Sequence, residues 1–131
     1  MIHIKPILII EDDEASAYYL EEVVAEMGGK TIIASTAEEA IKIVSEQEVS
    51  LILMDIRLPD MDGYELTQHF RKIGIATPIV AQTAFVMADD RQKALDAGCN
   101  DYLGKPIQKD VLSGMIHKYL NSSESVILKN Q

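Results

Sequence analysis

Five polar residues of this sequence have side chains that together could hold a metal ion and a phosphoryl group. Glu11 and Asp12 follow the apolar run ILII, Asp55 follows LILM, Thr83 lies just past IVA, and Lys105 follows YLG. Mg²⁺ prefers oxygen ligands such as carboxylates, and phosphoryl transfer mainly requires positioning and stabilisation of charge. Three carboxylates with a hydroxyl and an ammonium group therefore suit a divalent cation and a phosphoryl group, provided that they meet in space.

The order of the predicted elements brings these residues together. Short β-rich runs alternate five times with helix-like segments, which is typical of a parallel sheet in an α/β protein. The carboxyl ends of parallel strands lie on one edge of such a sheet, where ligands bind. We therefore expect a three-layer α/β/α sandwich around five parallel strands. The predicted strands are 7–10, 31–34, 51–54, 78–81 and 102–103, and the predicted helices include 14–27, 87–97 and 109–120.

Local signals set the remaining helices and their buried faces. Thr36 with Glu39 predicts a capping box, and Asp62 with Glu65 predicts the start of the next helix. The run 51–54 is apolar without alternation, so we place it at the centre of the sheet. The residues expected to face the core include Leu66, Phe70 and Ile73 in the third helix and Val111, Leu112, Met115, Ile116 and Tyr119 in the last.

Composition excludes several classes of protein. The 131 residues favour one domain, and 12 basic against 21 acidic side chains give a net charge of -9, which argues against direct binding of nucleic acid. No apolar run approaches the roughly 20 residues that cross a bilayer, so we expect no membrane insertion. The single Cys99 favours a reducing compartment, and the cytoplasm is the expected location. We expect residues 1–120 to form the domain and residues 121–131 a polar tail that frays.

Asp55 is the best candidate for a reactive group. Glu11, Asp12 and Asp55 would repel one another in one cleft unless a cation were present. A carboxylate can act as a nucleophile and form an aspartyl phosphate. Asp55 is expected to have the metal on one side and Lys105 on the other, which favours that role.

Four motifs in register resemble the receiver domains of two-component response regulators. They are IIEDDE at residues 9–14, LMDIRLPDMDG at residues 53–63, the pair Thr83-Ala84, and DYLGKP at residues 101–106. The resemblance covers residues 5–120. It implies a flavodoxin-like sheet with strand order 2-1-3-4-5 and a signalling function in a phosphorelay.

The resemblance also implies roles at the phosphoryl group. Asp55 would accept it, and Lys105 would pair with its oxygens, with a cis peptide bond before Pro106. Thr83 would then move toward the phosphoryl group, and Tyr102 would swing inward behind it. The face made by the fourth helix, the fifth strand and the fifth helix would repack, which is a two-state element biased by a local charge.

The implied cofactor is Mg²⁺, with Mn²⁺ as an alternative ion. Asp12 and Asp55 would ligate it directly, Glu11 directly or through water, and Arg57 through its main-chain carbonyl. The implied donor is a phosphohistidine on a histidine kinase or a histidine phosphotransfer domain. The chain would be no enzyme beyond catalysing its own phosphorylation and dephosphorylation, although a parent chain could be a histidine kinase. A dimer that forms on phosphorylation is also compatible with the resemblance.

The sequence leaves alternatives open. The segment Lys105-Pro106-Ile107 and the stretch 87–99 resemble receivers attached to hybrid sensor kinases, which favours that origin over a stand-alone regulator. A phosphatase of the haloacid-dehalogenase kind also uses an aspartate at a strand end, but it would need a second aspartate where Arg57 stands. An interaction module of the same fold that is never phosphorylated would be expected to lack one of the key residues.

Two positions bear on how long a phosphoryl group would last. Arg57 and Phe85 stand two residues past Asp55 and Thr83, along the path by which water would attack an aspartyl phosphate. Neither side chain can act as a base or as a compact amide that orients water. We therefore predict slow self-dephosphorylation.

Overall fold

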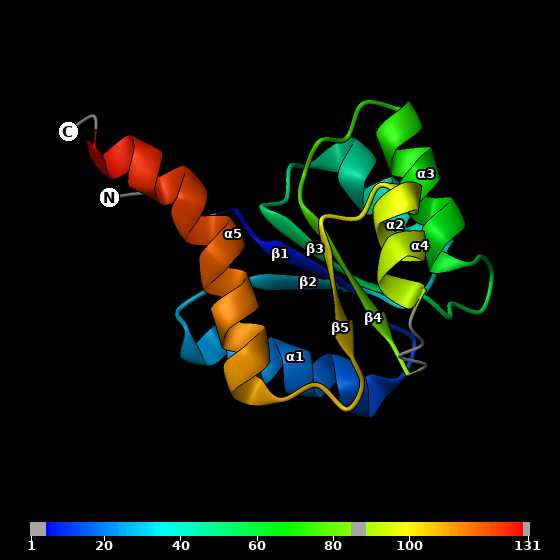
Figure 1. Cartoon of the computed structure of the whole chain (residues 1–131), viewed down its shortest axis with the longest axis horizontal. Helices are drawn as coiled ribbons and strands as arrows, with labels where there is room; N and C mark the ends of the chain where they lie inside the picture. Colours follow the sequence, from blue (N-terminus) through cyan, green and yellow to red (C-terminus); the bar gives the residue numbers. More distant parts are fainter. Residues whose placement is uncertain (1–4, 85–88, 130–131) are drawn as a thin grey trace.

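Five parallel strands form one sheet in the order β2-β1-β3-β4-β5, with helices on both of its faces (Figure 1). A computed structural model of the chain describes residues 5–84 and 89–129, with side chains as far as residue 120. The predicted three-layer sandwich and its strand order are confirmed. The elements are β1 Ile7–Ile10, α1 Glu14–Glu26, β2 Thr31–Ala34, α2 Ala37–Glu46, β3 Leu51–Asp55, α3 Gly63–Lys72, β4 Ile79–Thr83, α4 Asp90–Ala97, β5 Asp101–Gly104 and α5 Lys109–Lys129.

Each face of the sheet has its own apolar core. Residues of α2, α3 and α4, such as Ala40, Phe70 and Ala94, cover one face, while Leu20 of α1 and Ile116 of α5 cover the other. Every residue of β3 is buried, as predicted for a central strand whose two faces are both covered. The carboxyl edge of the sheet is therefore supported from both sides.

The strand register places the ends of neighbouring strands side by side. Ile10 of β1 pairs with Met54 of β3, and Asp55 at the end of β3 pairs with Gln82 of β4. Glu11, which directly follows Ile10, therefore lies beside Asp55. This alignment brings the predicted acidic residues to one edge.

Side chains cap the helices that begin near this edge. The Asp13 carboxylate accepts from the Ser16 main-chain N–H at 2.9 Å at the start of α1, and Thr36 Oγ1 accepts from the Glu39 N–H at 3.1 Å at the start of α2. The Glu39 carboxylate accepts from Ser35 and not from the Thr36 N–H, so only half of the predicted capping box forms in its usual way. Asp62 caps α3 by accepting from the Tyr64 N–H at 2.7 Å.

Two residues predicted to face the core do not. Ile73 lies just past the last residue of α3 and is 53% exposed, so it has left the buried stripe of that helix. Val111 is 47% exposed, because α5 packs on the sheet through Leu112 and Ile116, and Val111 lies in its first turn away from that stripe.

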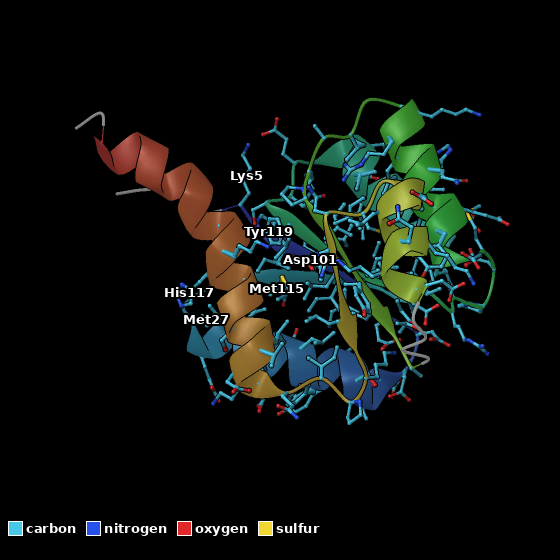
Figure 2. The ribbon with its side chains drawn as sticks, viewed as in Figure 1. Lys5, Met27, Asp101, Met115, His117 and Tyr119 are labelled. Carbon is cyan, nitrogen blue, oxygen red and sulfur yellow. The ribbon has the colours of Figure 1, made fainter. Side chains whose placement is uncertain are left out.

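The last helix is longer than predicted. It continues to Lys129, whereas the sequence predicted that it would end at about Leu120 (Figure 1). Residues 121–129 contain neither proline nor glycine, so nothing in their sequence stops the helix. The side chains of α5 also hold β5: the Tyr119 hydroxyl donates to Asp101 Oδ2 at 3.0 Å, beside which Lys118 makes an ion pair (Figure 2).

Candidate functional site

Three charged side chains from three strand ends meet at the carboxyl edge of the sheet. Lys105, which follows β5, places its Nζ 2.9 Å from Glu11 Oε1 and 3.4 Å from Asp55 Oδ1. Glu11 and Asp55 are only 2% and 5% exposed. Buried carboxylates are stable as ions only when they are paired, and the single ammonium group of Lys105 serves both of them. The predicted convergence of these residues is confirmed.

Asp12 completes an acidic cluster. One carboxylate oxygen from each of Glu11, Asp12 and Asp55 can be chosen so that all three lie within 4.8 Å of one another. The second oxygen of Glu11, Oε2, is buried and has no hydrogen-bond partner among the described residues. A buried oxygen without a partner, next to two further carboxylates, fits the all-oxygen coordination of Mg²⁺ or Mn²⁺. The residues present therefore suit the predicted cation.

The buried charges shift one another's protonation. Burial, followed by the closeness of Asp55, raises the pKa of Glu11 to about 7, although Lys105 opposes this rise. Burial by itself would lower the pKa of Lys105, but its interactions with Glu11 and Asp55 outweigh burial and raise that pKa. Lys105 is therefore a permanent cation, while Glu11 carries a proton in part of the molecules near neutral pH when no metal is bound.

The two predicted switch residues lie on the neighbouring strands β4 and β5. Thr83 is the last residue of β4, and its carbonyl accepts from the Lys105 N–H at 2.7 Å, which ties the two strand ends together. Tyr102 is half-buried in β5 and packs against the core on the side of α3 and α4. The Lys105–Pro106 peptide bond is cis, as predicted.

The loop after β3 fixes the main chain next to Asp55. The Arg57 N–H donates to Asp55 Oδ1 at 3.2 Å, and the side chain of Arg57 is exposed. The main chain of Arg57 also forms an isolated antiparallel β-bridge with that of Asp62, the residue that caps α3. Phe85, the second residue predicted to affect the phosphoryl lifetime, lies outside the described residues.

Gly63 is a site residue that sequence reasoning missed. A Cβ atom at this position would lie 2.6 Å from the Asp55 carbonyl oxygen and 2.7 Å from the Ile56 Cα, both of which are main-chain atoms. Only glycine lets α3 begin this close to the reactive strand end. The pair Asp62-Gly63 belongs to the motif LMDIRLPDMDG, but the contact of Gly63 with Asp55 depends on the folded loop.

Asp60 is a second residue whose contact was not predicted. Its carboxylate accepts from the main-chain N–H groups of Ala37 at 2.9 Å and Glu38 at 3.0 Å, at the start of α2. These two bonds lower the pKa of Asp60. They satisfy free N–H groups of the helix and anchor the loop that follows Asp55.

Comparisons with known proteins agree on one family. Residues 7–117 match the family model described as the response regulator receiver domain. The chain is 31% identical over 113 residues to the sensor histidine kinase RcsC of Salmonella typhimurium, and the match covers 86% of this chain and 12% of that protein. It is 40% identical over 118 residues to hybrid signal transduction histidine kinase G of Dictyostelium discoideum, covering 86% of this chain and 3% of that protein.

Solved structures give the same result. A two-component response regulator from Clostridium difficile superimposes with a TM-score of 0.84 at 31% identity, covering 89% of this chain and 96% of that one. The chain thus spans a small part of the two kinases but nearly the whole of this regulator. Within the described part of the chain, no helix is both long and apolar enough to cross a membrane.

Proposed function

The chain belongs to the response regulator receiver domain family, and from this premise we propose that Asp55 accepts a phosphoryl group from a phosphohistidine. As a receiver, the chain is a signalling module of two-component systems. The observation that carries the proposal is the buried Asp55 carboxylate, held between the Lys105 ammonium group and the acidic pair Glu11 and Asp12. A non-phosphorylated module of the same fold would have no need for this costly set of buried charges.

The transfer exchanges one bond for another. An oxygen of the Asp55 carboxylate attacks the phosphorus atom of the phosphohistidine and forms a new P–O bond. The P–N bond breaks, and its electron pair stays on the imidazole nitrogen of the donor. Lys105 remains next to Asp55 Oδ1, where its positive charge stabilises the oxygens of the transferring group. The chain itself thus supplies both the nucleophile and part of the electrostatic stabilisation.

We propose that Mg²⁺, or Mn²⁺ in its place, is the cofactor. Glu11, Asp12 and Asp55 would hold it through side chains and Arg57 through its main-chain carbonyl. When bound, the cation neutralises negative charge on the carboxylates and the phosphoryl oxygens. The buried and unpartnered Glu11 Oε2 supports this assignment.

The proposed output is a change of conformation. Thr83 and Tyr102 lie on neighbouring strands, and Tyr102 pairs in register with Ala81. New charge on Asp55 would attract the hydroxyl of Thr83, and Tyr102 would move into the space behind it. The surface formed by α4, β5 and α5 would then present a different face to a partner.

Several features of the partners and the parent protein belong to the same proposal. The donor would be a histidine kinase or a histidine phosphotransfer domain, since relatives of the chain include a sensor histidine kinase and a hybrid histidine kinase. We favour a receiver of a hybrid kinase in the cytoplasm, with dimerisation on phosphorylation as a further feature. We further propose that residues 1–120 form the receiver domain and residues 121–131 a polar C-terminal tail.

Beryllofluoride, a mimic of a phosphoryl group on aspartate, tests the proposal. In the presence of Mg²⁺ we expect it to bind the wild type and to shift the backbone amide signals of β4 and β5. Binding should disappear in Asp55→Asn and persist in Asp89→Asn, which makes the same change at an exposed aspartate. Binding that survives in Asp55→Asn, or turnover of a phosphomonoester at Asp55, would contradict the receiver assignment.

A further inference from the structure

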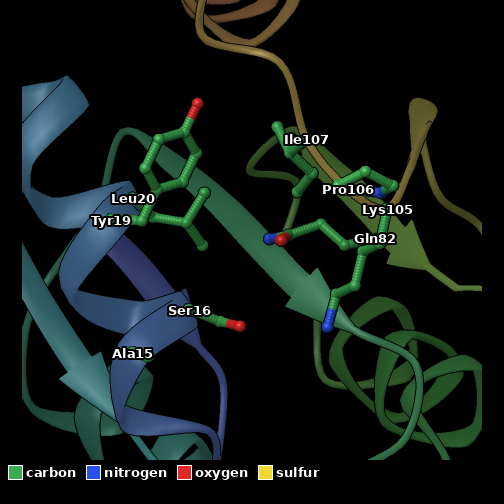
Figure 3. Close-up of a pocket in the computed structure, with 8 residues that line it drawn as sticks. All are labelled: Ala15, Ser16, Tyr19, Leu20, Gln82, Lys105, Pro106 and Ile107. Carbon is green, nitrogen blue, oxygen red and sulfur yellow. The ribbon is translucent and has the colours of Figure 1, made fainter.

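A second concave site lies beside the phosphoryl-acceptor site, on the other side of Lys105. It is a pocket of about 400 Å³ between α1 and the segment that joins β5 to α5 (Figure 3). Its walls are mainly apolar, and its volume lies in the range of small-molecule sites, roughly 300–1,000 Å³. The residues that matter for its chemistry are Tyr19, Leu20, Gln82, Lys105, Pro106 and Ile107.

The distinctive residue of this pocket is Gln82. It is fully buried near the end of β4, and neither its Nε2 nor its Oε1 has a hydrogen-bond partner among the described residues. The amide points into the pocket toward Leu20 and Tyr19, away from the amino group of Lys105 (Figure 3). Burying a primary amide with both groups unpaired is costly, and native proteins rarely retain such a group without a use for it.

The pocket also limits the charge of an occupant. Lys105 is the one charged side chain among its described lining residues, and its ammonium group already pairs with Glu11 and Asp55. An ionised ligand would therefore be desolvated without a free counter-charge, which disfavours it. A neutral ligand pays no such cost and can still use both groups of the Gln82 amide.

We propose that this pocket binds a neutral, flat ring that carries one hydrogen-bond donor and one acceptor side by side on one edge, as a cyclic amide does. No hydrogen bond from the described residues holds the buried Gln82 amide in place, so a turn of this side chain would bring Oε1 and Nε2 to the wall of the pocket. There the ligand would donate to Oε1 and accept from Nε2, while its ring packs against Leu20, Pro106 and Ile107. Side-chain amides read such paired edges on planar rings through two parallel hydrogen bonds. The proposal requires neither a metal nor phosphorylation of Asp55, so it stands or falls separately from the proposed function.

The test uses 2-quinolone, a cyclic amide on a flat apolar ring, titrated into the metal-free full chain and followed by two-dimensional ¹H–¹⁵N NMR. We expect it to shift the side-chain NH₂ signals of Gln82 and the amide signals of Ile107. Quinoline has the same ring without the N–H donor, and its affinity should be lower by about tenfold or more, since paired contacts of this kind discriminate at that level. Gln82→Met should bind 2-quinolone more weakly by the same factor of about ten. Gln92→Met, which makes the same change at an exposed glutamine of α4, should bind it as tightly as the wild type does.

The proposal is overturned if 2-quinolone leaves the Gln82 NH₂ signals unmoved up to its solubility limit. Equal affinities for 2-quinolone and quinoline would also overturn it, because the amide edge would then contribute nothing. The comparison of the two probes uses the wild type alone. It therefore decides the question even if Gln82→Met fails to fold.

Discussion

The metal-free protein should lose stability as the pH rises from about 4.5 to about 7, because folding buries the Glu11 carboxyl group. Burial and the nearby Asp55 raise its pKa from the ordinary value of 4.5 to about 7. The folded state thus holds this proton more tightly than the unfolded chain does. The stabilisation is complete below pH 4.5 and is lost as the pH rises through 7.

The size of the effect follows from the pKa difference. At about 1.4 kcal/mol per pKa unit, ionising Glu11 without a cation costs the folded state about 3 kcal/mol at pH 8. Glu11→Gln keeps the shape of the protonated carboxyl group but cannot ionise. The variant should therefore be more stable than the wild type by only about 1 kcal/mol or less at pH 5, and by about 3 kcal/mol at pH 8.

Urea unfolding between pH 5 and pH 8 in the presence of a chelator measures this difference. Taking the difference between the two proteins cancels the titration of all other groups, and Glu46→Gln provides the same change at an exposed glutamate. With saturating Mg²⁺ at pH 8 the wild type should instead be more stable than Glu11→Gln, because the cation binds the ionised carboxylate of the folded wild type. Parallel pH profiles for the wild type and Glu11→Gln would refute the reasoning.

Three further predictions concern the residues around Asp55. Lys105→Met should slow phosphorylation by a small acyl phosphate by about 10²-fold or more, as expected when a positioned charge is lost, and an unchanged rate would contradict its role. Arg57→Asn combined with Phe85→Glu should increase the rate of hydrolysis of the aspartyl phosphate by up to roughly 10²-fold, which a positioned base can supply. An unchanged rate would contradict the explanation of a long lifetime. Gly63→Ala should lower the free energy of unfolding by about 1–3 kcal/mol, because its Cβ would collide with the Asp55 carbonyl; a fully stable variant would show that the loop has room.

The site was predictable where it depends on the ends of strands. Apolar runs mark β1, β3, β4 and β5, and a parallel sheet aligns their carboxyl ends, so Glu11, Asp55 and Lys105 are expected at one edge. The strand order that places β1 next to β3 came from the resemblance to receiver domains. The hydrogen bond from the Lys105 main-chain N–H to the Thr83 carbonyl likewise depends on the alignment of the ends of β4 and β5. The short apolar runs and the polar residues that end them show directly where each strand stops.

Contacts between loops and the precise rotation of helices were not predictable in this way. Asp60 reaches the start of α2 across 23 positions, and the approach of Gly63 to Asp55 exists only in the folded loop. The exposure of Ile73 and Val111 depends on where α3 ends and on how α5 rotates against the sheet. Such features arise from packing between elements, and no local sequence pattern encodes them.

The most direct measurement locates the phosphoryl group itself. The chain is incubated with Mg²⁺ and a phosphorylated histidine phosphotransfer domain or an acyl phosphate, the acyl phosphate on the protein is trapped by reduction, and the modified residue is identified by peptide mass spectrometry. We expect modification at Asp55 alone, dependent on Mg²⁺ and absent in Asp55→Asn. Modification at Asp12 or at a histidine, or undiminished labelling of Asp55→Asn, would contradict it.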